Sequence, residues 1–75
     1  MKKITAKQLR TIIYVRETLQ KFVDGKLEKF DAYGLVFDQL DARRITLTNI
    51  CTIAESVGIK GDVIRMRRWQ FLGMR

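Results

Sequence analysis

Histidine is absent from the 75-residue sequence, and cysteine occurs once, as Cys51. A lone thiol cannot form an internal disulfide, and structural zinc sites draw their ligands mainly from cysteine and histidine. The sequence also has no glycine-rich phosphate loop and no nucleophile beside a general base. We therefore expect neither an enzyme nor a bound metal or cofactor, and we expect Cys51 to be a small buried apolar residue.

Proline and long apolar runs are missing as well. The absence of proline favours helices, because proline interrupts their hydrogen bonds. The longest uncharged stretch, residues 45–54, has ten residues, whereas a helix needs about 20 to cross a bilayer. The basic N-terminus resembles the start of a signal peptide, but Lys7 and Arg10 arrive before any apolar run. These features predict a cytoplasmic protein without a membrane segment, and a single thiol suits a reducing compartment.

Basic residues are plentiful and are concentrated at the two ends of the chain. The net charge is +7, and 47% of the residues are hydrophobic, which is enough to fold. Residues 1–29 carry eight Lys or Arg and three acids, residues 30–59 carry two and four, and residues 60–75 carry five and one. This distribution favours a polyanionic partner. We expect one domain over residues 1–75, and its small core favours a homodimer.

The first half of the chain predicts two helices. Thr5 and Gln8 fit a capping box, apolar residues follow at helical spacing, and Gly25 can end the run, so we expect a helix from Ala6 to Val23. Its apolar stripe is Leu9, Ile12, Ile13, Leu19 and Val23. A second helix is predicted from about Leu27 to Leu40, although a strand through residues 33–37 is the alternative.

The second half has an ambiguous segment and then a basic one. Residues 45–53 alternate as in a strand, yet Leu47, Ile50, Ala54 and Val57 also form a helical stripe. Segment 45–53 resembles segment 4–12, since both begin with Ile-Thr and end with Thr-Ile. We therefore predict a helix that begins at Thr46. A fourth helix is expected from Lys60 to about Phe71, which makes the fold class all-α.

Residues 50–69 resemble the helix-turn-helix superfamily of DNA-binding proteins. The pattern has a small residue in its first helix, a glycine four residues later in the turn, and apolar residues where the helices face the core. The positions that match are Ile53, Ala54, Val57, Gly58, Ile59 and Ile64. The resemblance implies a C-terminal helix-turn-helix at residues 46–71 and a small transcription regulator, such as a repressor of the type found in phages and plasmids, that binds double-stranded DNA.

The resemblance also implies which residues meet DNA. Helix 60–69 would be the recognition helix, entering the major groove with its N-terminal end. Arg65 would contact guanine, and Lys60 and Arg68 would contact phosphates. Asp62 would cap the helix, and Trp69 is expected in the core or at a dimer contact. The full set of expected interface residues is Lys60, Gly61, Asp62, Arg65, Arg67, Arg68 and Trp69.

Arg67 departs from the family pattern, which usually has an apolar residue three positions after Ile64. An unpaired guanidinium buried there would be costly. Either its stem covers Ile64 and Ile53 while its head reaches water or phosphate, or the helix is rotated so that Met66 or Phe71 fills the gap.

Two other interpretations compete. Residues 44–47, followed by 58–65, are similar to ribbon-helix-helix repressors, in which a strand reads the groove, but residues 47–58 are too short for that family's first helix. The stronger alternative is a small helical adaptor or inhibitor that binds a protein through the apolar stripe of the first helix.

Overall fold

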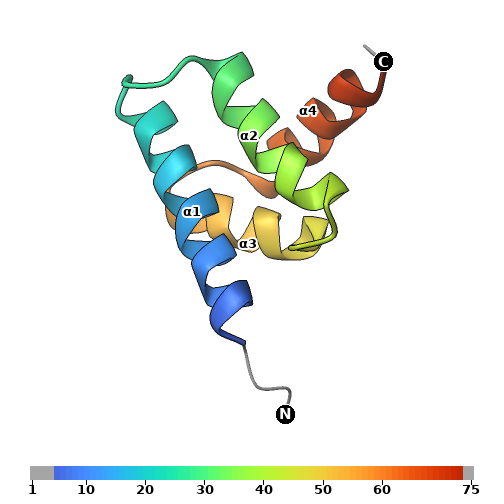
Figure 1. Cartoon of the computed structure of the whole chain (residues 1–75). Coiled ribbons are helices and arrows are strands. Elements are labelled where there is room, and N and C mark those ends of the chain that lie inside the picture. Colours follow the sequence, from blue (N-terminus) through green and yellow to red (C-terminus); the bar gives the residue numbers. More distant parts are fainter. Residues whose placement is uncertain (1–4, 74–75) are drawn as a thin grey trace.

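Every regular element in the computed structural model, which describes residues 5–73, is a helix (Figure 1). The four helices are α1 (Ala6–Val23), α2 (Lys29–Asp41), α3 (Leu47–Ser56) and α4 (Gly61–Gly73). The prediction of an all-α fold is confirmed. No helix within the described residues is both long and apolar enough to cross a membrane.

The helices pack around one core. α1 and α2 form an antiparallel hairpin, α3 lies across its lower end, and α4 packs against α3 and then alongside α2 (Figure 1). The largest fully buried side chains come from all four helices, and they are Val15, Leu19, Tyr33, Val36, Phe37, Ile50 and Ile64.

Threonine caps the N-terminus of both α1 and α3. The Thr5 hydroxyl accepts a hydrogen bond from the Gln8 backbone N–H at 3.1 Å, and the Gln8 side chain accepts one from Thr5 N–H at 3.0 Å. The Thr46 hydroxyl accepts from Asn49 N–H at 3.2 Å. The similarity of segments 4–12 and 45–53 therefore marks two equivalent helix starts. The strand suggested for 45–53 is wrong, because this capping and the burial of Ile50 and Ile53 favour a helix.

The same hydrogen-bond pattern ends α1, α2 and α3. In each, the residue after the C-cap donates to the carbonyl three residues back, and the next residue donates to the carbonyl five residues back. The left-handed position is Gly25 (φ 78°) after α1 and Gly58 (φ 93°) after α3, where glycine has no steric cost. After α2 it is Arg43, at φ 60°. Arginine therefore occupies a position that favours glycine.

Helix α2 differs from its prediction at both ends. Because it is helical through residues 33–37, the alternative prediction of a strand there is wrong. The helix begins at Lys29 and ends at Asp41, one or two residues later than expected. Tyr33, Val36 and Phe37 are buried at helical spacing, which a strand would divide between two faces. Gly34 lies inside the helix next to α4, and an added Cβ would be in ordinary van der Waals contact with the Phe71 ring at 3.8 Å.

The buried face of α1 is rotated from the predicted apolar stripe. Its buried residues are Thr11, Val15, Thr18 and Leu19. Each threonine hydroxyl donates to the carbonyl four residues back, at 3.0 Å and 2.7 Å, and this satisfies its polar atom inside the protein. Leu9 and Ile13 are consequently left half exposed. The predicted apolar stripe is therefore only partly covered by the rest of the fold, because the threonines can be buried in its place at little cost.

The left-handed Arg43 predicts an unusual stabilising substitution. We expect Arg43→Gly to raise the free energy of unfolding by about 1 kcal/mol, because glycine relieves the steric cost of φ 60°. Chemical denaturation measures it. The matched control is Arg44→Gly, next to it and without a positive φ, where added chain freedom should reduce stability by about 0.5 kcal/mol. Equal effects of the two substitutions would contradict the explanation.

Candidate nucleic-acid interface

A four-residue bend, residues 57–60, joins α3 to α4. Gly58 adopts φ 93° there and has open space around its Cα, so its backbone conformation, not crowding, requires glycine. Ala54 of α3 and Ile64 of α4 are both 0% exposed. Ile53 and Ile59 are also buried, and Val57 packs partly against the core. Of the six residues that carry the resemblance, Ile53, Ala54, Ile59 and Ile64 are therefore buried, Val57 is half-buried, and Gly58 has a positive φ.

The first turn of α4 has one side facing α3. The Lys60 carbonyl accepts hydrogen bonds from the N–H groups of Val63 (3.0 Å) and Ile64 (3.4 Å), while Lys60 itself is exposed. Gly61 lies against α3, where an added Cβ would be 3.5 Å from the Cβ of Cys51. Gly61 is half-buried: it contacts α3 on one side and lines a surface pocket with Lys60 and Arg65 on the other. Cys51 is buried, as predicted.

Four residues of α4 point away from the core: Asp62, Arg65, Met66 and Trp69 are all exposed. Trp69 is 79% exposed, so the suggestion that it belongs to the core is wrong. A shallow pocket of about 350 Å³ beside this face is lined by Glu55, Lys60, Asp62 and Arg65, among others. The face therefore carries both signs of charge at the start of α4, and an aromatic side chain further along.

Arg68 faces α2 instead of solvent. Its Nη2 lies 2.5 Å from the Asp41 carboxylate, and its guanidinium lies 5.5 Å from the centre of the Phe37 ring. The side chain is only 17% exposed. An arginine held by an ion pair and a cation–π contact is poorly placed to bind phosphate. We therefore remove Arg68 from the expected interface; it joins α4 to α2.

Arg67 lines a pocket with Lys29, Phe30 and Tyr33 of α2, which fits the rotated arrangement of the two predicted for it. Its Nη1 donates to the Gln70 side chain at 2.7 Å, while its Nε is buried without a partner. Phe71 fills the neighbouring space, 5.2 Å from the Phe37 ring, whereas Met66 stays exposed. The helix is therefore turned so that positions 67, 68 and 71 meet α2. A helix-turn-helix pattern alone does not predict this, because it does not specify what lies beside the second helix.

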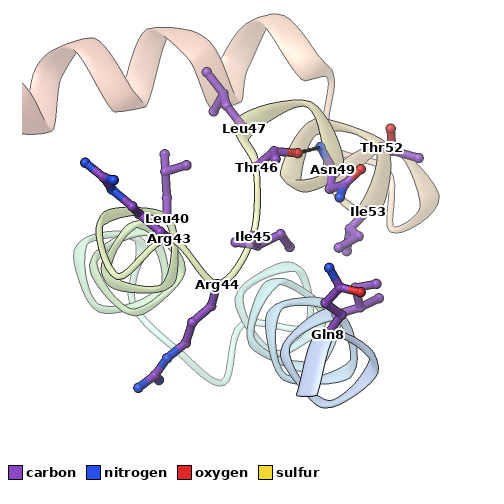
Figure 2. Close-up of a pocket in the computed structure, with 11 residues that line it drawn as sticks. Gln8, Leu40, Arg43, Arg44, Ile45, Thr46, Leu47, Asn49, Thr52 and Ile53 are labelled. Atoms are coloured by element: carbon purple, nitrogen blue, oxygen red, sulfur yellow. Dashed lines mark hydrogen bonds between the residues drawn. The ribbon is translucent and has the colours of Figure 1, made fainter. Parts of the chain in front are cut away.

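A second cationic surface lies at the other end of α3, where α1, the α2–α3 loop and α3 meet (Figure 2). Arg43 and Arg44 lie at the edge of a pocket of about 770 Å³, and no acidic residue of the described chain lines it. Its apolar lining is Ile12, Leu40, Ile45, Leu47 and Ile53. The sequence interpretation gave Arg43 no role and included Arg44 only in the ribbon-helix-helix alternative. The sequence feature that could have indicated this surface is the pair of adjacent arginines shortly before the capping residue Thr46.

The bend, the exposed face of α4 and the arginine pair are features of this chain's own structure. Comparison with family models, with curated proteins and with solved structures finds no match.

Arg67→Leu tests the geometry of α4 without any ligand. We expect the free energy of unfolding to rise by about 0.5–2 kcal/mol, because leucine removes a buried, unpartnered Nε and keeps apolar contact with α2. Thermal and chemical denaturation measure the change. Arg65→Leu on the exposed face serves as the control and should change stability by less than about 0.5 kcal/mol. A loss above about 2 kcal/mol for Arg67→Leu would instead indicate an essential buried interaction.

Proposed function

We propose that this protein is a small sequence-specific transcription regulator that binds double-stranded DNA with a helix-turn-helix formed by α3 and α4. The single observation that supports this most is the bend at Gly58, with Ala54 and Ile64 fully buried at the helix crossing and the opposite face of α4 exposed. In this motif the buried residues hold the second helix at a fixed angle, so that its outer face can enter the major groove.

The proposed contacts come from the first two turns of α4. Arg65 is exposed and its guanidinium can pair with guanine O6 and N7 in the major groove. Lys60, exposed in the bend, would contact phosphate. Asp62 lies in the first turn of the helix, where its carboxylate is favoured by the helix dipole and repelled by DNA. Its proposed role is therefore to stabilise the helix start.

The arginine pair extends the proposed interface. α3 has ten residues, and at 1.5 Å each it spans about 15 Å. Arg43 and Arg44 precede this helix, and Lys60 follows it. With the connections at its two ends, α3 is therefore long enough to cross the major groove, which is about 12 Å wide. Basic residues on both ends of α3 could therefore reach the phosphates that border the groove occupied by α4.

Salt dependence tests this set of contacts. If Arg43, Arg44 and Lys60 each neutralise one phosphate, log K should fall with log salt at a slope of about −2.7 per subunit. Gel shifts with random duplex DNA, at low and increasing salt, measure it. Arg44→Ala should reduce the slope by about 0.9 and keep the preferred sequence, which is obtained by selection from a random DNA pool.

Arg65→Ala is the matched comparison. It should lower affinity for the selected site by about 1–3 kcal/mol and relax the preference for guanine at one position. Binding that does not respond to salt would show that these residues do not meet a nucleic-acid backbone. An unchanged base preference in Arg65→Ala would show that Arg65 does not recognise a base.

We also propose a two-fold homodimer, because one small recognition unit provides limited affinity. The half-exposed Leu9 and Ile13 lie one turn apart on α1 and supply an apolar contact. Sedimentation equilibrium at micromolar concentration should show a dimer, with or without DNA, and Ile13→Glu should shift it toward monomer. A strict monomer under both conditions would contradict this assembly.

A second candidate function is binding to a protein. Trp69, Met66 and Leu72 are all exposed on α4, and a protein partner would bury them. In this alternative the basic residues attract an acidic partner. The low-salt gel shift separates the two candidates, since a DNA-binding protein must retain measurable affinity for random duplex DNA.

A further inference from the structure

A pocket between the first turns of α2 and the last turns of α4 lies apart from the proposed DNA interface. Its volume is about 420 Å³, which falls within the range of small-molecule sites, about 300–1,000 Å³. Apart from Gly73, its lining consists of Lys29, Phe30, Tyr33, Arg67, Gln70 and Phe71. Aromatic and cationic side chains thus make up most of its wall.

The aromatic part of the wall can hold a flat ring. Phe30 and Phe71 lie 5.7 Å apart between ring centres, at an angle of 49°. Phe71 is held in place by an edge contact with Phe37, whereas Phe30 is 57% exposed. A ligand that covers a large exposed apolar side chain removes its surface from water, and this favours binding.

The charged part of the wall favours an anion. Lys29 and Arg67 both line the pocket, and no acidic residue of the described chain does. Arg67 uses Nη1 to bind Gln70, and its Nε has no partner. A carboxylate commonly pairs with two nitrogens of a guanidinium at once. A small rotation of the Arg67 head would let a carboxylate supply the partner that Nε lacks.

Tyr33 adds a polar group that the fold itself does not use. The side chain is 1% exposed, and its ring packs between those of Phe22 (5.4 Å) and Phe37 (5.9 Å). Its hydroxyl has no hydrogen-bond partner among residues 5–73, although Tyr33 lines the pocket. Burial raises the pKa of this hydroxyl, and the nearby Arg67 charge opposes the rise, so the group stays a neutral donor at neutral pH.

We propose that this pocket binds a small aromatic carboxylate. The ring of the ligand packs against Phe30 and Phe71, its carboxylate pairs with Arg67, and the Tyr33 hydroxyl donates a hydrogen bond to one carboxylate oxygen. Lys29 contributes positive charge at the entrance. The site uses residues from two helices, so an occupied pocket strengthens the contact between α2 and α4. The inference does not depend on DNA binding.

The test is isothermal titration calorimetry of the full chain with phenylacetate, its neutral analogue phenylacetamide, and cyclohexylacetate, which lacks the aromatic ring. Phenylacetate should bind with a Kd on the order of 1 mM or tighter, as its size allows. The amide should bind about tenfold more weakly, because it cannot form the charged pair. Cyclohexylacetate should also bind more weakly, because it lacks the aromatic face.

Two variants locate the site. Arg67→Leu, which should remain folded, is expected to weaken phenylacetate binding at least tenfold, and Tyr33→Phe, which keeps the ring, should weaken it severalfold. Arg16→Leu, an exposed arginine on α1, is the matched control and should bind as the original protein does. Absence of binding, equal binding of acid and amide, or full affinity in both pocket variants would overturn the proposal. Each result is obtained without DNA, so it is independent of the proposed regulator function.

Discussion

Four aromatic rings in contact connect three of the four helices. Phe22 of α1 meets Tyr33 of α2 at 5.4 Å, Tyr33 meets Phe37 at 5.9 Å, and Phe37 meets Phe71 of α4 at 5.2 Å. Each ring removes a large apolar surface from water, and each contact constrains the rotation of the helices that carry it. Together with the Arg68–Asp41 ion pair, this row holds the C-terminal half of α4 against α2. Phe71 also lies near Gly34, where an added Cβ would be in ordinary van der Waals contact with its ring at 3.8 Å.

Local signals in the sequence predicted where the helices begin and end better than how they face one another. The caps at Thr5 and Thr46 and the glycine at position 58 act through hydrogen bonds and backbone angles within a few residues, so they can be recognised without a structure. The rotation of α1 could not be predicted in this way, because it depends on which neighbour covers Thr11 and Thr18. The same limit applies to Arg67 and Arg68: their sequence suggests a basic surface, and the proximity of α2 turns both of them inward.

Helix α4 therefore has two functionally different parts. Its first turns contact α3 and leave Asp62 and Arg65 exposed, beside Lys60 of the preceding bend, whereas its later turns use Arg67, Arg68 and Phe71 to contact α2. The basic charge at the end of the chain is thus divided between an outer surface and an internal contact. Of the residues expected at the interface from sequence, the structure leaves Lys60, Asp62, Arg65 and Trp69 exposed. It also shows Arg43 and Arg44 exposed beside a pocket, and their positions before a capped helix gave only a weak signal in the sequence.

The short connections between the helices have a kinetic consequence. Five residues join α1 to α2, five join α2 to α3 and four join α3 to α4, and three of the four helices end in hydrogen bonds that close within six residues. Most of the native structure can therefore form without closing a long loop, and small helical proteins of this kind fold in about microseconds to milliseconds. The sequence has no proline whose isomerisation would delay folding. Such a chain can reach its folded state almost as soon as its last helix leaves the ribosome, before exposed apolar segments have time to aggregate.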